Sequence, residues 1–437
     1  MRRRHFLRAG ALPLALMVGS GSNASSTAPR RKPDDPAAMP APEIDPSYEI
    51  TEDEEDFGAQ AVPDRKYDIV MKGGRVIDPS QSLNAVADVA IKDGTIAAIA
   101  PQIEARDAVQ AVRVNGQIVT PGLVDLHVHG FEGTSQWGLN LDQYCIARGV
   151  TTGIDAGTSG ADSFDGFRKV VIERSRTRVW AFINISRVGL IANPGELIDE
   201  RMIDAATALR AAKAHADVIV GVKVRCGRSY SGPNDLHAVK EARKVCDAIG
   251  KPLMIHVNTP YTPMDQILNE TRAGDIVTHA FRKQGQGGVI GPDGHVSDYI
   301  RKAANKGVLF DIGHGSAGFS FASTAAALKE GFVPSSISSD IHAHCAMGPV
   351  FDLLTTMAKL TVLGMSLEKA VELVTVAPAR AIHKEGEIGS LKPGRRADIS
   401  VFDLVKGDFS LIDSQGEIRH ASEKLSPALI LRDGKLP

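Results

Sequence analysis

The sequence predicts an α/β protein in which a (β/α)8 TIM barrel is joined to a small β-sandwich domain built from both flanking segments. Three observations support this fold. Eight short apolar runs alternate with stretches whose apolar residues recur at three- and four-residue spacing, which is typical of buried parallel strands with covering helices. No glycine-rich dinucleotide turn follows the first run, which disfavours the alternative, an open doubly wound sheet. Short β-rich runs broken by Gly and Asp lie on both sides of this region and predict the second domain.

The predicted parts follow one another along the chain. We expect an export signal at 1–24, a linker at 25–66, the barrel at 120–379, and the sandwich at 67–119 plus 380–437. Clear helical patterns occupy 236–249 and 321–329. The eight barrel strands are expected at 123–129, 150–156, 179–185, 219–225, 253–257, 276–280, 308–312 and 336–340.

The first residues have the character of a targeting segment. Arg3 and Arg4 precede a mildly apolar stretch that is too short to span a membrane, and small residues follow at 22–24. This pattern predicts export to the periplasm, or elsewhere outside the cytoplasm, by the twin-arginine route; an ordinary secretory signal is the alternative. Residues 25–66 are rich in Pro and acids and predict a flexible linker, with an arm that packs on a neighbouring subunit as the alternative.

Composition excludes several classes of function. Lys and Arg number 50 and Asp and Glu 52, so no basic surface is available for nucleic acid or anionic lipid. The 4 cysteines include no CxxC pair, which argues against a disulfide framework or a zinc ribbon. We therefore expect a small-molecule substrate and neither a nucleic-acid nor a membrane partner; the sequence leaves a homo-oligomer open.

Six polar side chains stand at the carboxyl ends of the predicted strands. In a (β/α)8 barrel these ends meet on one rim and form the active site. A single strand histidine is usually a satisfied core residue, but six polar groups in register would each need a buried partner of their own. We therefore predict one site made of His127, His129, Lys223, His256, His279 and Asp340.

The spacing of the histidines indicates a metal centre. Side chains alternate along a strand, so His127 and His129 point the same way. Neutral imidazole suits zinc and its neighbours, and Asp340 completes a mixed nitrogen and oxygen ligand set. His256 and His279 then hold a second ion. We expect two divalent ions per chain, with zinc as the expected metal.

Lys223 is unusual in such a site, because its ammonium group would be repelled by two cations. Reaction of the amine with carbon dioxide would give a carbamate, N6-carboxylysine, whose anionic oxygens can bridge two metals. The alternative is a lysine that is salt-bridged or extends to the surface.

A centre of this kind predicts hydrolysis by metal-held hydroxide. Two ions lower the pKa of a bridging water, and one of them polarises the scissile carbonyl. Asp340, beside that water, is the predicted catalytic residue that accepts the proton and passes it to the leaving group.

Residues 121–129, which read Pro-Gly-Leu-Val-Asp-Leu-His-Val-His, resemble the first strand of the amidohydrolase superfamily, which includes dihydroorotases and hydantoinases. The resemblance covers nearly the whole chain after the linker. It implies the same ligand sets, with N6-carboxylysine at Lys223 as the bridge. In dihydroorotases an arginine follows the histidine pair, whereas Gly130 follows it here, which disfavours that activity. The superfamily resemblance includes 377–380, and further segments resemble the subgroup of amidohydrolase/deacetylase metallohydrolases, namely 149–152, 175–178, 311–315 and 338–342.

The predicted function is therefore a binuclear metal-dependent hydrolase that cleaves an amide or ester bond of a small acylated acid. The resemblance implies N-acyl amino acids or O-acetyl hydroxy acids as the substrate class. Hydrolysis of a cyclic amide, as in hydantoinases, or of a dipeptide is the alternative within the same class. A non-catalytic scaffold is disfavoured because all six ligands are present.

Four residues are weaker candidates for substrate binding. Arg225 shares the strand face of Lys223 and is expected to clamp a substrate carboxylate, or else to pair with Asp155. Tyr230 lies beyond the fourth strand and could hydrogen-bond a carbonyl oxygen. His314 and His342 stand near the last two strand ends and could orient a ligand or substrate. Two cysteines fall in rim loops as free or paired thiols, Cys226 and Cys345.

Overall fold

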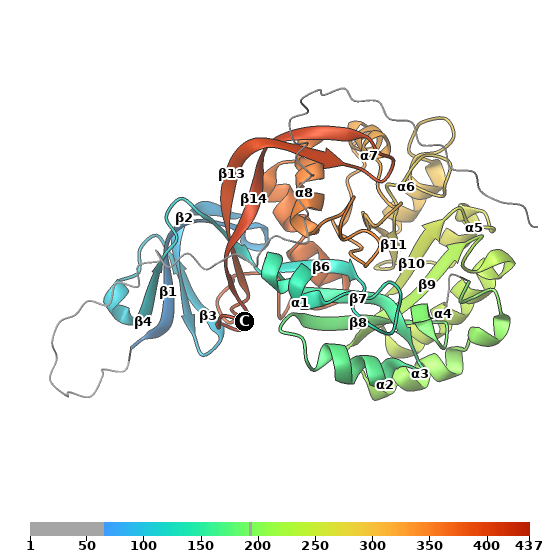
Figure 1. The fold of residues 1–437 in the computed structure, drawn as a ribbon, viewed down its shortest axis with the longest axis horizontal. Coiled ribbons are helices and arrows are strands. Elements are labelled where there is room, and N and C mark those ends of the chain that lie inside the picture. Colours follow the sequence, from blue (N-terminus) through green and yellow to red (C-terminus); the bar gives the residue numbers. More distant parts are fainter. Residues whose placement is uncertain (1–64, 192–194) are drawn as a thin grey trace, which may run out of the picture. The chain divides into compact units, whose positions relative to one another are not determined.

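The computed structural model describes residues 65–191 and 195–437. The predicted export signal and nearly all of the predicted linker lie outside the described residues. The described chain is a mixed α/β structure with two seven-stranded sheets (Figure 1). Within these residues, no helix has the length and apolar character needed to cross a membrane.

One sheet is parallel throughout and follows the chain order from β6 to β12. Five of its strands are buried along their whole length, as a sheet covered on both faces requires. Figure 1 shows α2, α3 and α4 packed against this sheet. The strands are β6 (Leu123–Val128), β7 (Val150–Gly160), β8 (Arg178–Asn184), β9 (Ile219–Gly227), β10 (Leu253–Asn258), β11 (Ile276–Thr278) and β12 (Leu309–Phe310).

The eighth predicted strand, 336–340, does not form a ladder. It touches both edges of the parallel sheet through single parallel bridges, from Ser336 to Asp311 and from Ile341 to Val128. Asp340 has a φ of 48°, so the chain leaves the extended conformation there. The other seven predicted strands are present.

The helices agree with the apolar spacing of the sequence. The predicted segments 236–249 and 321–329 correspond to α4 (Asp235–Ile249) and α7 (Phe321–Lys329). α4 buries Ala238, Ala242 and Val245 and ends at Gly250, whose φ of 66° stops the helix. The others are α1 (Leu141–Tyr144), α2 (Phe164–Phe167), α3 (Ala205–Ala214), α5 (Met264–Asn269), α6 (Asp298–Asn305), α8 (Leu353–Val362), α9 (Leu367–Leu373) and α10 (Val376–Ala381).

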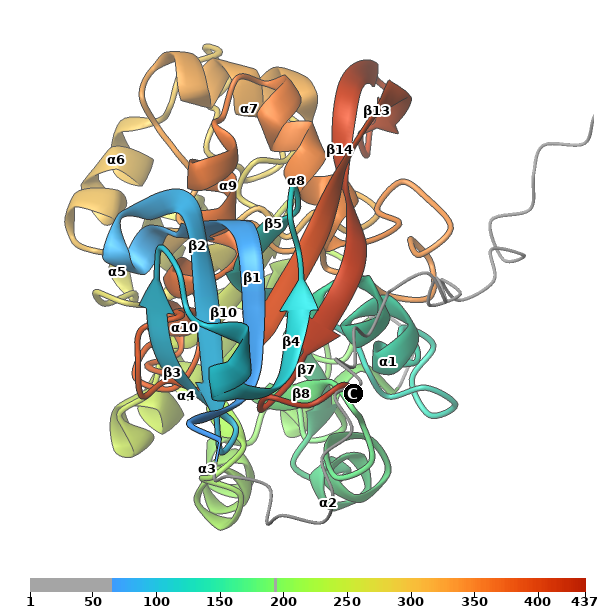
Figure 2. The same cartoon turned by 90° about the vertical axis from the view of Figure 1, so that its left-hand side faces the viewer.

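The second sheet joins the two flanking segments, as the sequence predicts. Its strand order is β14-β13-β5-β1-β2-β3, with β4 beside β1 (Figure 2). All of these strands belong to one hydrogen-bonded sheet, so the sandwich itself stays a prediction. The strands are β1 (Tyr67–Asp78), β2 (Leu83–Lys92), β3 (Thr95–Ala100), β4 (Ala108–Arg113), β5 (Ile118–Pro121), β13 (Ile399–Ile412) and β14 (Ile418–Leu431).

A buried charge cluster ties the second sheet to the parallel one. Arg178, the first residue of β8, donates to Asp398, and its Nη2 lies 2.9 Å from both carboxylate oxygens of Asp433. Asp398 is 2% exposed and precedes β13, whereas Asp433 follows β14. Both carboxylates are thus neutralised by an arginine of the other sheet.

Arg178→Met should lower the free energy of unfolding by about 3–5 kcal/mol, because it leaves a buried carboxylate without a counter-charge. Denaturant unfolding followed by circular dichroism would measure the change. The matched control is Arg187→Met, since the Arg187–Asp162 pair is 42% and 41% exposed and should contribute little to stability. Equal small losses in the two variants would contradict the cluster's structural role.

Candidate active site

The six predicted ligands line one cavity of about 80 Å³. That is several times the roughly 10–15 Å³ needed by one water molecule. His127 and His256 lie in β6 and β10, Lys223 lies in β9, and His279 directly follows β11. The histidines thus lie at or just beyond the carboxyl ends of their strands, as predicted, whereas Lys223 lies in the middle of β9 and Asp340 lies in the segment 336–341, which forms no ladder.

His127, His129 and Asp340 form the tightest group. Nε2 of each histidine lies 3.1 Å from the same carboxylate oxygen, Asp340 Oδ1. Candidate ligand atoms of the three residues all lie within 4.8 Å of one another. Two imidazole nitrogens and one carboxylate oxygen are a suitable donor set for one divalent ion.

Threonine hydroxyls form hydrogen bonds with the Nδ1 atoms of His127 and His129. His127 Nδ1 lies 3.0 Å from Thr278 Oγ1, and the Thr278 hydroxyl donates to Asp311 Oδ2 at 2.8 Å. His129 Nδ1 lies 2.7 Å from Thr158 Oγ1. A proton on Nδ1 that is donated to the hydroxyl leaves the Nε2 lone pair free to bind a metal.

His256 and His279 supply two ring nitrogens that have no protein partner. Their ring centroids are 4.2 Å apart. His279 Nδ1 donates to the Gly313 carbonyl oxygen at 2.6 Å, so its Nε2 carries a lone pair. Nε2 of both residues is buried and lacks a hydrogen-bond partner among the described residues. Such atoms are rare in folded proteins, and a second divalent ion would satisfy both.

Lys223 extends into the cluster from β9 and is 1% exposed. Its Nζ lies 3.2 Å from His127 Nε2 and 3.4 Å from Met254 Sδ. Among the described residues, no carboxylate lies within ion-pair distance of this nitrogen. Burial lowers the pKa of the Lys223 amine to about 7. The predicted alternative of a salt-bridged or surface lysine is therefore wrong.

The backbone around Asp340 is shaped for its carboxylate. The loop that contains Gly315 passes so close to Asp340 that a Cβ on Gly315 would lie 2.0 Å from Asp340 Oδ2. Asp125 accepts the backbone N–H of Ser339 at 2.9 Å and so anchors the residue before Asp340. Burial raises the pKa of the Asp340 carboxyl to about 6.

Three of the four substrate candidates line the cavity: Arg225, Tyr230 and His342. His342 Nε2 lies 4.0 Å from Asp340 Oδ2. The Tyr230 ring lies edge-on to His256 with centroids 4.9 Å apart, and its hydroxyl accepts from Asn258 Nδ2 at 3.3 Å.

Arg225 pairs with a residue that the sequence did not suggest. Its Nε and Nη2 bind the two carboxylate oxygens of Glu196 at 2.6 and 2.7 Å. The predicted alternative, a pair with Asp155, is wrong. Asp155 instead accepts backbone N–H groups of Gly130 and Thr158.

His314 is not brought to the cavity. Its Nδ1 donates to the Gly315 carbonyl oxygen at 2.9 Å, and its Nε2 accepts from Lys359 Nζ at 2.8 Å. Both ring nitrogens form hydrogen bonds with other residues of the fold, so His314 stabilises this loop and does not bind substrate. Cys226 and Cys345 are buried free thiols.

Several cavity residues escaped the sequence prediction. Arg282 stands three positions after His279, close enough in the chain to have been recognised as part of the same rim. Asn258 shares the strand face of His256, two positions earlier in β10, so period-two alternation could also have indicated it. Trp137 carries no such signal. Glu196, which pairs with Arg225, follows a segment without regular apolar spacing. This pairing could therefore not be predicted from the sequence.

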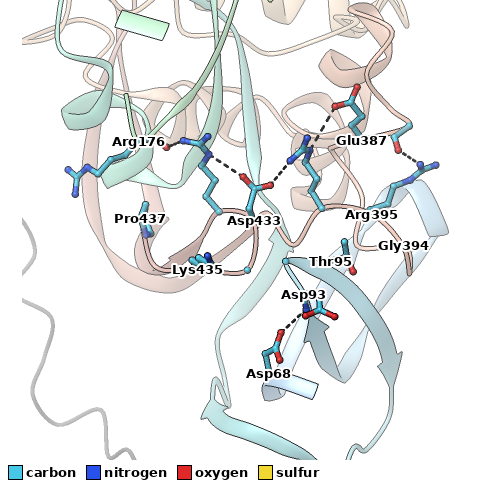
Figure 3. A pocket seen from close by; sticks show the side chains of 15 residues that line it. Asp68, Asp93, Thr95, Arg176, Glu387, Gly394, Arg395, Asp433, Lys435 and Pro437 are labelled. Atoms are coloured by element: carbon cyan, nitrogen blue, oxygen red, sulfur yellow. Dashed lines mark hydrogen bonds and ion pairs between the residues drawn. The ribbon is translucent and has the colours of Figure 1, made fainter. Parts of the chain in front are cut away.

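A larger hollow of about 1080 Å³ lies beside the start of β1 and the C-terminus (Figure 3). Its arginines already have partners. Arg396 Nη1 lies 2.8 Å from Asp433 Oδ1, and Arg395 donates to the Gly386 carbonyl oxygen. Figure 3 shows Asp433 held by guanidinium groups on both sides. None of the six predicted ligands lines this hollow, so the smaller cavity is the candidate active site.

Comparisons with known proteins identify the family to which the chain is similar. The sequence profile described as the amidohydrolase family matches residues 118–436. A deacetylase of Brucella anthropi is 37% identical over 347 residues, which cover 79% of this chain and 86% of the relative.

Two solved structures have similar folds. A structure described as an adenine deaminase has a TM-score of 0.79 and 34% identity, and the match covers 85% of this chain and 99% of that one. A structure described as a dihydroorotase has a TM-score of 0.77 and 34% identity, with 84% and 96% covered. The three proteins carry three different activity names, so the choice of substrate depends on the site itself.

Proposed function

The chain belongs to the amidohydrolase family and is a hydrolase, and from this premise we propose that it cleaves an amide or ester bond of a small acylated acid with two bound divalent ions. The convergence of four imidazoles, Lys223 and Asp340 on one buried cavity carries this proposal. The similarity to a protein named deacetylase supports an acyl substrate.

We propose that His127, His129 and Asp340 hold one ion and that His256 and His279 hold the other, with zinc in both sites. The unpartnered Nε2 atoms of the second pair support the second ion. We propose that Lys223 becomes N6-carboxylysine. Its Nζ lone pair attacks the carbon of carbon dioxide, so that an N–C bond forms while one C–O π bond opens and leaves its electron pair on oxygen. One proton passes from the nitrogen to water, which gives the carbamate anion. The lack of a carboxylate partner for Lys223 in the described part of the chain supports this modification.

The parallel sheet is, in this proposal, a (β/α)8 barrel closed by residues 336–341. The two single bridges to Asp311 and Val128 support the closure. Closure brings Asp340 opposite the histidine pair of β6, which places the first and last strand ends in one site.

When bound, the ions would lower the pKa of water and polarise the scissile carbonyl. Asp340 is the only carboxylate among the described residues that line the cavity. It therefore accepts a proton from the attacking water and donates it to the departing nitrogen or oxygen. Tyr230 lines the same cavity, and its hydroxyl, which accepts from Asn258, keeps a proton that it can donate to the carbonyl oxygen.

The metal-loaded protein should hydrolyse N-acetyl amino acids or O-acetyl hydroxy acids, and elemental analysis should find two ions per chain. A panel that also holds dipeptides, hydantoin, dihydroorotate and adenine tests the activities named for the similar structures. Activity on dihydroorotate or hydantoin alone would favour the cyclic-amide alternative. One ion per chain with full activity would reduce the centre to a mononuclear one.

A further inference from the structure

Arg282 is a buried cation at the cavity wall, and the residues that the structure describes provide no counter-charge for it. It is 2% exposed and lines the same cavity as the six ligands. Its Nη1 donates to the Val257 carbonyl oxygen, and its Nε donates to Gln286 Oε1 at 3.3 Å. Within the described parts of the chain, no carboxylate lies within ion-pair distance, and Nη2 has no protein partner.

The two cavity arginines differ in what they can still bind. Arg225 is neutralised by Glu196, which occupies two of its nitrogens. Arg282 retains its full charge, and burial alone lowers its pKa, to about 10. A buried charge is costly unless it is paired, so an anion is needed at Arg282 and not at Arg225.

The position of Arg282 indicates where this anion lies. The Val257 carbonyl oxygen that holds the guanidinium belongs to the residue after His256, and Arg282 itself follows His279 by three residues. The guanidinium is thus fixed at the His256 and His279 side of the cavity, away from the Asp340 contact with His127 and His129.

We propose that Arg282 binds the carboxylate of the amino- or hydroxy-acid portion of the substrate. This inference rests on the proposed function and narrows it: the substrate is an acylated acid whose carboxylate is free, and the matching neutral amide or ester is a poor substrate. Arg282 replaces Arg225 as the residue that recognises the acid.

The test compares an N-acetyl amino acid with its carboxamide, in which the carboxylate alone is neutralised. For the wild type, kcat/KM should favour the acid by about tenfold to a hundredfold, the usual range for a charge-assisted hydrogen bond. Arg282→Gln should abolish most of this preference, chiefly through a higher KM for the acid, and leave kcat/KM for the carboxamide nearly unchanged. Arg282→Lys should restore part of the preference.

Arg228→Gln is the control, because Arg228 is an exposed arginine near the rim that does not line the cavity. It should keep the wild-type preference. Equal losses on both substrates in Arg282→Gln would overturn the inference and make Arg282 a structural residue. If neither variant folds, the wild type still decides, because equal kcat/KM for acid and carboxamide also overturns it. Failure of the wild type to hydrolyse either compound would instead overturn the proposed function.

Discussion

Asp340→Asn should reduce kcat by about a hundred- to ten-thousand-fold while the protein keeps most of its metal. The amide retains an oxygen at the position 3.1 Å from both histidine nitrogens, but it cannot accept a proton. Esters should lose less than amides, because an alkoxide needs protonation less than a departing amine does. Steady-state kinetics and elemental analysis on the same preparation would measure both quantities.

The control for this variant is Asp275→Asn, the same chemical change at a buried carboxylate. Asp275 precedes β11, whereas His279 follows it, so the two lie at opposite ends of that strand. The control should leave kcat near the wild-type value in folded protein. Near-normal turnover of Asp340→Asn with two ions bound would place the proton transfer elsewhere, and His342, 4.0 Å from Asp340 Oδ2, would be tested next.

Lys223→Ala should remove the second ion and nearly all activity. A ligand that bridges two ions affects both sites, so the loss in metal affinity should exceed the roughly 10–100-fold typical of a supporting partner. Added short carboxylic acids should restore part of the metal binding and part of the activity. In the wild type, bicarbonate labelled with carbon-13 should give a carbamate signal once metal is added.

Lys359→Ala serves as the matched control, since Lys359 is also a fully buried lysine but lies against His314 and Pro349. It should keep both ions. A structure of the metal-loaded wild type with an unmodified Lys223 amine beside two ions would contradict the carbamate.

The sequence was sufficient for much of the candidate site because strand geometry is regular. Period-two alternation placed His127 and His129 on one face, and the rule that parallel strands end at one rim brought His256, His279 and Lys223 to the same cavity. The same regularity located α4 and α7. The prediction of an eighth strand at 336–340 was wrong because Asp340 adopts a positive φ, and the spacing of apolar residues does not indicate such a backbone conformation.

The sequence by itself determined the α/β class, the combination of two distant segments in one sheet, and the set of six residues that meet in the cavity. Only the tertiary structure decided which arginine is free. Arg225 and Arg282 are alike as residues, but Glu196 lies against Arg225, whereas no carboxylate of residues 65–191 or 195–437 lies against Arg282. Whether a buried charge is already neutralised depends on side chains that approach from other segments, and residue spacing along one strand carries no information about them.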